Sequence, residues 1–325
     1  PKRCPYCQGE TFQRWGKTKR RIKDTRVRSI EVVRYKCTQC RRTFRVYPAG
    51  AGAAQQSERL KKLSVIMWSL GLSYRGVEQV LAAFEVYLSH MSGWRNVQEE
   101  GEAIRRRMKW KGVRVVGVDG AWVGGRGIVV AVDLGNGRLL EIAEIDERDK
   151  GTVAAWLKEL KERHQIGAIV SDDLATYKQA ADELGLGHQV CQFHVRRWVG
   201  ATLKRLEQAL PAEWQYVPGT IREVLRDLPP NGDRILYELW RSLPGRTTAP
   251  GEKRTPLEKL RDLLLRLSQD WRRYTAFYDD PGIPWTNNRT EQMIGRLKSR
   301  AKRVRGYKTA AGLLAGSLVA CQVWT

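Results

Sequence analysis

The middle of the chain carries an order of strand and helix patterns that leaves few folds open. One apolar run ends at Asp119, two more follow around the hairpin signal Gly135-Asn136-Gly137, and a later run ends at Asp172. The expected segments in chain order are three strands (113–119, 128–134 and 139–145), a helix (149–164), a strand (167–173), a helix (175–184) and a strand (188–193). The fold class is therefore α/β, with a mixed sheet.

Three strands, helix, strand, helix, strand is the order of the ribonuclease H type of sheet, in which the ends of the first and fourth strands lie side by side. Asp119 and Asp172 would then meet although they are 53 residues apart. Paired carboxylates repel unless a cation lies between them, and oxygen ligands select Mg²⁺ or Mn²⁺. Two such ions are the arrangement used for phosphoryl transfer. The alternative, acids that only finish strands and face water, is favoured for one Asp but not for two at matched ends.

A third carboxylate is expected on a later helix that crosses the sheet. Glu291 follows the capping candidates Thr286 and Asn287 and would lie in the first turn of that helix. Lys298 lies two turns further along the same face, where it would place a cation beside the metal site. The alternative for Glu291, an exposed acid on a surface helix, stays open from spacing alone.

Two Cys-x-x-Cys pairs near the N-terminus predict a zinc site. The ligands are Cys4, Cys7, Cys37 and Cys40. A two-residue spacing lets a tight turn direct both thiolates to one ion, and the alternating segments between the pairs predict a β-hairpin. Residues 1–48 are therefore interpreted as a zinc ribbon whose Zn²⁺ is structural. A disulfide pair or a redox motif is disfavoured because no βαβ pattern flanks the cysteines.

A small-residue linker follows the ribbon, and residues 53–110 are expected to be helical. Helices are predicted from Ser57 to Gly71, from Ser73 onward, and around 86–97. This is a helix-turn-helix-like arrangement in which Arg75 opens a helix that would reach DNA. A plain three-helix connector is an equal alternative.

The charge distribution indicates a polyanionic partner. The chain has 58 Lys and Arg against 35 Asp and Glu, for a net charge of +23. Of this, +12 lies in residues 1–48, and after Glu291 there are seven basic residues and no acid. Two separated basic blocks indicate two contacts with the backbone of double-stranded DNA. The residues selected for DNA contact are Arg20, Arg21, Arg41, Arg42, Arg75, Lys298, Lys302 and Arg303.

Membrane association and export are not expected. The weakly polar stretch 309–324 is shorter than the roughly 18 to 20 residues that span a bilayer. The first residues are charged and polar, unlike a signal peptide. A cytoplasmic, nucleoid-associated protein is predicted.

Several of these motifs together resemble the Asp-Asp-Glu transposases of bacterial insertion sequences, most closely those related to the mutator-like group. The first of these motifs are the zinc ribbon, which ends in 35–44, Asp119 and the pair Ser171-Asp172. The others are the Cys-x-x-His motif of Cys191 and His194, and the Asn-Asn-x-x-Glu motif of 287–291 followed by Lys298. The resemblance covers essentially the whole chain.

The resemblance implies a catalytic triad of Asp119, Asp172 and Glu291 that holds two Mg²⁺ (or Mn²⁺). It implies a catalytic core in 111–195, an α-helical insertion in 196–283 and the C-terminal helices of the core in 284–325. It also implies a homodimer that binds terminal inverted repeats, cleaves a phosphodiester to free a 3′-OH and joins it to target DNA. A nuclease that cuts without joining and an inactive DNA-binding regulator are the rival functions.

Some roles stay open at this point. The separation of Asp172 and Glu291 is 119 residues, longer than in compact members, and either Asp172 or Asp173 is the ligand, with the first favoured by the resemblance. In one interpretation, His194 contacts the scissile phosphate or stabilises the position of Asp172. In the other, Cys191 is a core residue and His194 caps the helix that follows. An accessory role is also assigned to Asn288. Most Trp residues of the insertion, and Cys321, are expected in the core.

Overall fold

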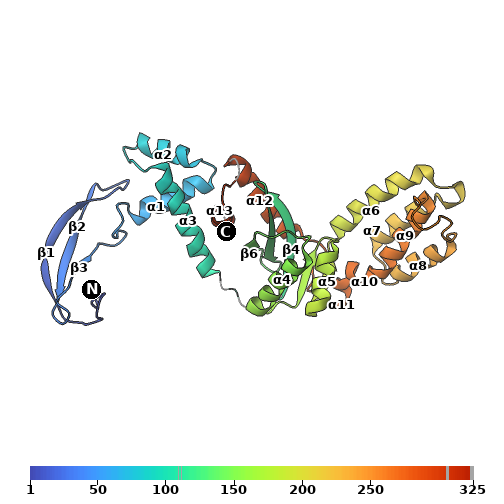
Figure 1. The fold of residues 1–325 in the computed structure, drawn as a ribbon, viewed down its shortest axis with the longest axis horizontal. Helices are drawn as coiled ribbons and strands as arrows, with labels where there is room; N and C mark the ends of the chain where they lie inside the picture. The colour runs from blue at the N-terminus through green and yellow to red at the C-terminus, as the bar shows by residue number, and fades with distance from the viewer. Residues whose placement is uncertain (109, 111, 305–306, 323–325) are drawn as a thin grey trace. The chain divides into compact units, whose positions relative to one another are not determined.

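The computed structural model describes residues 1–108, 110, 112–304 and 307–322. The chain divides into two compact units, one made of Pro1–Arg107 with Ser299–Thr325 and the other of Met108–Lys298. Figure 1 shows the elements of both. Residues 284–298 of the segment expected in the catalytic core lie in the second unit, and 299–325 lie in the first unit.

The first unit begins with a three-stranded antiparallel sheet of β1 (Phe12–Arg21), β2 (Ser29–Cys37) and β3 (Thr43–Val46). The hairpin expected between the cysteine pairs is therefore present. Phe12 packs edge-on against Tyr35 and Phe44, with ring centroids 5.5 and 5.7 Å away. The buried residues of this sheet are few, and they include Cys4 and Cys37 themselves. A core this small depends on an additional cross-link such as a metal ion.

Helices α1 (Glu58–Ser69), α2 (Tyr74–Ala83) and α3 (His90–Arg107) follow. Ser57 and Ser73 cap the first two as expected, because their hydroxyls accept the N–H of Leu60 and Gly76 at 3.1 and 3.0 Å. The third helix begins later than predicted, since Val86 precedes it in a non-helical segment.

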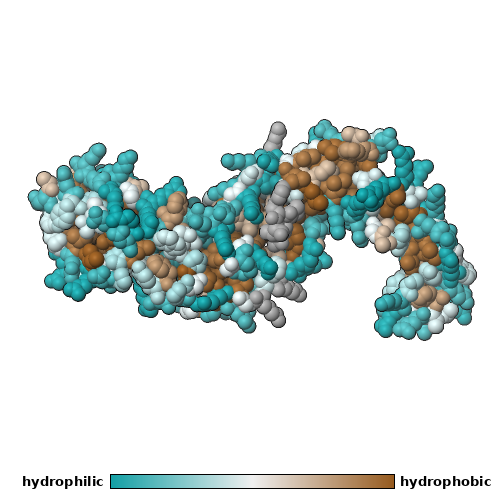
Figure 2. Space-filling model, turned by 180° about the vertical axis from the view of Figure 1, so that it is seen from behind, coloured by the Kyte–Doolittle hydropathy of each residue, from teal (hydrophilic) through white to brown (hydrophobic). Residues whose placement is uncertain are grey.

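The C-terminal helix α13 (Ala310–Gln322) packs on α3. A Cβ at Gly101 would collide with the backbone of Ala315, so the two helices approach as closely as glycine allows. Cys321 is buried here, as predicted. The small apolar residues of α13 therefore serve packing. Among the described residues, no helix has the length and apolar character needed to cross a membrane, and hydrophilic side chains interrupt the apolar areas on the face drawn in Figure 2.

The second unit is built on a five-stranded mixed sheet with the order β6-β5-β4-β7-β8. β4 pairs antiparallel with β5 and parallel with β7, which confirms that the first and fourth expected strands are neighbours. The elements are β4 (Val115–Val123), β5 (Arg126–Asp133), β6 (Leu139–Ala143), α4 (Lys150–His164), β7 (Ala168–Ser171), α5 (Ala175–Leu184) and β8 (Gly187–Val190). This is the strand order expected for the ribonuclease H type of sheet.

Helices cover both faces of this sheet. Val116, Val118 and Val129 pack in one buried cluster with Leu157 of α4 and Tyr177 of α5. The other face is crossed by α12 (Asn288–Arg303). A Cβ at Gly117 would collide with the side chains of Asn287 and Thr290, so glycine permits α12 to approach β4 closely.

A helical insertion with its own apolar core separates β8 from α12 (Figure 1). It begins earlier than the expected 196, because the fifth strand ends at Val190 and residues 192–194 are already helical. Trp271 is buried in its core, as predicted, whereas Trp198, Trp214 and Trp240 are partly buried and pack against that core. Its elements are α6 (Gln192–Leu206), the 3₁₀ turns Glu207–Ala209 and Ala212–Trp214, α7 (Val217–Asp227), α8 (Gly232–Ser242), α9 (Pro256–Gln269), α10 (Trp271–Tyr274) and α11 (Ala276–Asp279).

Candidate active site

Three carboxylates meet at the edge of the sheet where β4 and β7 separate. Oxygens of Asp119, Glu147 and Asp172 all lie within 4.8 Å of one another. The parallel register of β4 and β7, with Gly117 opposite Val170, carries Asp119 and Asp172 to the same place. The predicted meeting of Asp119 and Asp172 is therefore present in the structure. We call these three residues the carboxylate cluster.

Asp119 is not at the end of its strand, contrary to the expectation. β4 continues to Val123 because it forms a hairpin with β5, in which Asp119 lies opposite Val130. The parallel partner β7 stops at Ser171, so Asp119 lies just beyond the paired segment. The space beside Asp119 is therefore opened by the end of the neighbouring strand β7, and not by the end of β4.

Glu147 is a member of the cluster that the sequence analysis missed. It lies in the loop between β6 and α4, where its main-chain oxygen accepts the Thr176 hydroxyl at 2.8 Å and its Oε2 accepts the Tyr177 hydroxyl at 3.3 Å. Its carboxylate packs against Gly120, where a Cβ would collide with it. The one signal in the sequence is this glycine directly after Asp119.

The cluster holds its negative charge at an energetic cost. Burial, and then the charges of Asp172, Glu147 and Glu291, raises the pKa of Asp119 to about 7. Burial and the charge of Glu147 raise the pKa of Asp172 to about 6, although the nearby His194 opposes the rise. Burial also raises the pKa of Glu147. Several oxygen ligands that ionise with difficulty are a donor set that fits a hard divalent cation such as Mg²⁺ or Mn²⁺.

Glu291 lies in the first turn of α12, as predicted, and comes close enough to raise the pKa of Asp119. Its Oε1 is 2.9 Å from Nε2 of His194. The ligand atoms of Glu291, His194 and Cys191 lie within 4.8 Å of one another and form a second group beside the cluster. Of the predicted triad, Asp119 and Asp172 meet in the cluster, and Glu291 lies beside it in contact with His194.

Cys191 directly follows β8, near a strand end as expected, and His194 lies in the first turn of α6, where the sequence predicts a strand up to 193. Cys191 is the N-cap residue, is buried, and its Sγ accepts the backbone N–H of Asn287 at 3.3 Å. His194 lies within the helix, so it does not cap it. The burial expected for Cys191 in the alternative interpretation is observed, but its sulfur also faces the site.

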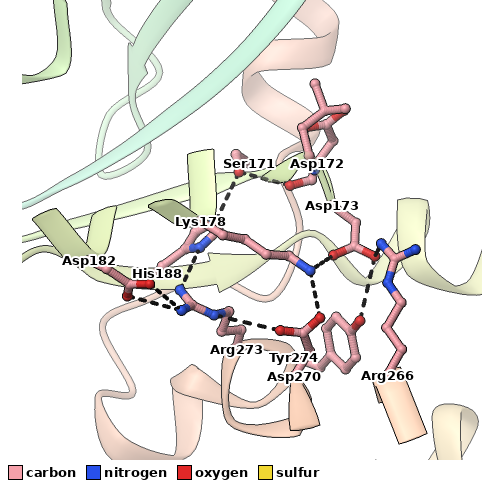
Figure 3. Close-up of polar contacts among 11 residues, drawn as sticks. Ser171, Asp172, Asp173, Lys178, Asp182, His188, Arg266, Asp270, Arg273 and Tyr274 are labelled. Carbon is pink, nitrogen blue, oxygen red and sulfur yellow. Dashed lines mark hydrogen bonds and ion pairs between the residues drawn. The ribbon is translucent and has the colours of Figure 1, made fainter. Parts of the chain in front are cut away.

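Asp172 and Asp173 point in different directions (Figure 3). Asp173 is nearly fully buried and forms ion pairs with Lys178 and with Nη2 of Arg266, the latter at 2.7 Å. Nζ of Lys178 also contacts Asp270 at 2.7 Å, and the Tyr274 hydroxyl lies 3.5 Å from Asp173. We call these five residues the Asp173 network. It joins the end of β7 to the helical insertion, and leaves Asp172 as the residue available at the cluster.

The residues around Glu291 differ in exposure. Asn288, to which an accessory role was assigned, is exposed, whereas the preceding Asn287 is buried and its Nδ2 donates to the main-chain oxygen of Val118 at 3.0 Å. This hydrogen bond from Asn287 therefore links the start of α12 to Val118, the residue before Asp119. Lys298 is exposed on α12.

In the first unit, several residues selected for DNA contact have partners within the chain. Arg303 donates to the main-chain oxygen of Leu70 at 3.3 Å, and Arg20 donates to that of Ala53 at 3.2 Å. The guanidinium of Arg42 lies 5.3 Å from the ring centre of Tyr6. The exposed residues of the set in this unit include Arg21, Arg41, Arg42, Arg75 and Lys302.

The four N-terminal cysteines converge as a zinc site requires. The Sγ atoms of Cys4 and Cys40 are 3.7 Å apart and those of Cys7 and Cys37 are 3.6 Å apart. A tetrahedral Zn²⁺ with Zn–S bonds of about 2.3 Å separates its sulfurs by about 3.8 Å. All four sulfurs lie within 4.8 Å of one another. These residues fit a structural zinc ion.

Comparisons with known proteins place these features in a family. A model of the transposase IS66 family matches residues 141–314, which is more than half of the chain. The match includes Glu147, Asp172 and Glu291, while Asp119 lies before it.

Individual relatives are distant. The "insertion element ISM1 uncharacterized 48.3 kDa protein" of Methanobrevibacter smithii is 21% identical over 339 residues, which cover 99% of this chain and 82% of that protein. The catalytic core domain of BIV integrase is 20% identical, with a TM-score of 0.23, and the match covers 47% of this chain and 96% of that one. At that TM-score we base the fold on the strand order of the sheet alone. By its family match, the chain belongs to the IS66 family of transposases.

Proposed function

We propose that the protein is a DNA transposase of an insertion sequence that cleaves a phosphodiester to free a 3′-OH and joins it to target DNA. The observation that carries the proposal is the meeting of three carboxylates from separate segments at the edge between β4 and β7, with Glu291 close enough to raise the pKa of Asp119. Burial and mutual repulsion raise the pKa of Asp119 to about 7 and that of Asp172 to about 6. Such a site is stabilised by divalent cations from solution.

In this proposal Asp119, Glu147 and Asp172 hold one cation, and Glu291 with Asp119 or Asp172 holds another. Two bound Mg²⁺ ions would supply Lewis acidity at the attacking and leaving oxygens of the phosphodiester. Asn287 fixes α12 against β4, so that Glu291 stays beside Asp119. The exposed Lys298 contacts the phosphate backbone of the DNA end.

The first unit would recognise the terminal inverted repeats. Its cysteine site holds Zn²⁺ in a ribbon, and the exposed Arg21, Arg42 and Arg75 contact phosphates. The helix-turn-helix role of α1 to α3, the homodimer, the nucleoid location and the similarity to the mutator-like group stay predictions beside the family membership.

A joining assay tests the proposal. The DNA that flanks the gene supplies candidate inverted repeats, and pre-cleaved end duplexes with a free 3′-OH are incubated with a target plasmid and Mg²⁺. Joined products are expected with the wild-type chain and not with Asp119→Asn. Glu162→Gln, an exposed acid on α4 outside the cluster, is the control.

Two outcomes separate the rival functions. Cleavage of intact ends without joining of pre-cleaved ends would identify a nuclease. Specific end binding with neither reaction, and unchanged by Asp119→Asn, would identify a DNA-binding regulator.

A further inference from the structure

We propose that Cys191, His194 and Glu291 form a second metal site that binds Zn²⁺ or a similar transition-metal ion, and that its occupation withdraws Glu291 from the carboxylate cluster. The first part stands on geometry alone. The second part rests on the proposed function, because it concerns the role of Glu291 there.

The geometry of the three side chains suits one ion. Their ligand atoms, Sγ, an imidazole nitrogen and a carboxylate oxygen, lie within 4.8 Å of one another, and Nε2 of His194 is 2.9 Å from Oε1 of Glu291. In a tetrahedral zinc site with bonds of about 2.0 to 2.3 Å, ligand atoms are about 3.3 to 3.8 Å apart. Small side-chain movements would therefore bring all three into the first coordination sphere.

The backbone at the start of α6 places Cys191 and His194 on the same face of the helix. Cys191 is the N-cap of α6 and His194 follows three residues later, so the two side chains share one face of the first turn. Glu291 comes from the first turn of α12, which faces them. The peptide N–H of Asn287 donates to the sulfur of Cys191 at 3.3 Å and so fixes the position of that ligand atom.

The chemistry of this group differs from that of its neighbour. Sulfur and imidazole ligands select Zn²⁺, whereas an all-oxygen group such as Asp119, Glu147 and Asp172 selects Mg²⁺ or Mn²⁺. Three protein ligands leave a fourth position for water or a phosphate oxygen. Because Glu291 can serve either group, Zn²⁺ in the second site and Mg²⁺ in the cluster compete for its carboxylate.

Cobalt spectroscopy tests the site without any activity. The full chain is first given about one equivalent of Zn²⁺ to fill the four-cysteine site, which prefers zinc, and is then titrated with Co²⁺. We expect about one further equivalent of Co²⁺ to bind with a thiolate-to-cobalt charge-transfer band and tetrahedral visible bands. Cys191→Ser should remove the charge-transfer band, and His194→Ala should weaken the binding about tenfold or more.

Two controls make the result specific. Cys321→Ser removes the other buried thiol outside the ribbon and should leave the spectrum unchanged. Asp119→Asn should also leave it unchanged, since Asp119 is not in this group. Absence of the band in the wild-type chain, or its persistence in Cys191→Ser, would overturn the proposal.

The competition is tested in the Mg²⁺-supported cleavage assay. Zn²⁺ should inhibit the wild-type chain, and Cys191→Ser should need about tenfold or more Zn²⁺ for the same inhibition. Equal inhibition of both would overturn the competition while leaving the cobalt site standing. A cobalt site in a chain without cleavage or joining would instead contradict the proposed function, and joining without a cobalt site would contradict only this inference.

Discussion

The carboxylate cluster and the Asp173 network contain neighbouring aspartates at the end of β7 that bury their charge in opposite ways. Asp172 lies beside two more carboxylates, and burial together with the charge of Glu147 raises its pKa to about 6. Asp173 lies between Lys178 and Arg266 (Figure 3). One charge is neutralised by side chains of the chain itself and the other is left for ions from solution. The contrast distinguishes the proposed metal site from a structural ion pair in adjacent residues.

The largest expected effect is on catalysis. Asp119→Asn or Asp172→Asn should reduce cleavage and joining by about 10³-fold or more, because each removes a charged ligand from the cluster. At pH 7 the folded state of either variant should be at least as stable as that of the wild-type chain, since a neutral amide relieves the repulsion among the carboxylates of the cluster. Rates are measured on end duplexes, and stability by chemical denaturation without divalent ions. Retained activity in both variants would contradict the metal role of the cluster.

Asp173→Asn should instead act on stability. Removing one partner of a buried ion pair leaves Lys178 incompletely neutralised and should lower the free energy of unfolding by about 3 kcal/mol. Asp279→Asn, which breaks an exposed pair with Arg272, is the control and should cost less than about 1 kcal/mol. Urea denaturation at pH 7 compares them. If Asp173→Asn matched the control in stability, the contrast between the two aspartates would fail.

Glu147→Gln tests whether the cluster extends beyond Asp119 and Asp172. Loss of this carboxylate should weaken Mn²⁺ binding and lower activity by about 10- to 100-fold. The matched control is Glu162→Gln, an exposed acid on α4. Calorimetric titration with Mn²⁺ provides a readout independent of activity, and an affinity equal to that of the control would remove Glu147 from the site.

The last effect concerns pH and is spread over about three pH units. The pKa of Asp119 rises on folding from 3.8 to about 7, so the folded chain binds this proton more tightly than the unfolded chain. Its contribution to stability is therefore present below about pH 4 and is lost as the pH rises to about 7, with a slope of up to about 1.4 kcal/mol per pH unit. Without divalent ions, wild type should lose stability relative to Asp119→Asn over this range. Added Mg²⁺ should remove the difference; a difference with the opposite sign would contradict the raised pKa.

Much of this arrangement follows from local patterns. Strand order and the hairpin signal predicted the neighbourhood of Asp119 and Asp172, because parallel strands place their carboxyl ends at one edge. Ser57 and Ser73 start their helices as capping residues, and Glu291 lies in the first turn of its helix as expected. These features could be predicted because they depend on residues that are close in the sequence, or on a strand order that few folds share.

Other features depend on contacts between distant segments and carry little local signal. Glu147 lies in an irregular loop and reaches the cluster only because Gly120 has no side chain. The ion pair between Asp173 and Arg266 forms because the fold of the helical insertion places Arg266 beside the end of β7. The packing of α13 on α3 through Gly101 joins the last helix to the first unit. Periodicity describes one element at a time and does not report such contacts.

The most direct measurement is calorimetric Mn²⁺ binding to the zinc-loaded full chain, compared between wild type, Asp119→Asn and Glu162→Gln. The account predicts binding at the carboxylate cluster that Asp119→Asn loses and Glu162→Gln keeps. Equal Mn²⁺ binding by wild type and Asp119→Asn would contradict the claim that this cluster is the metal site.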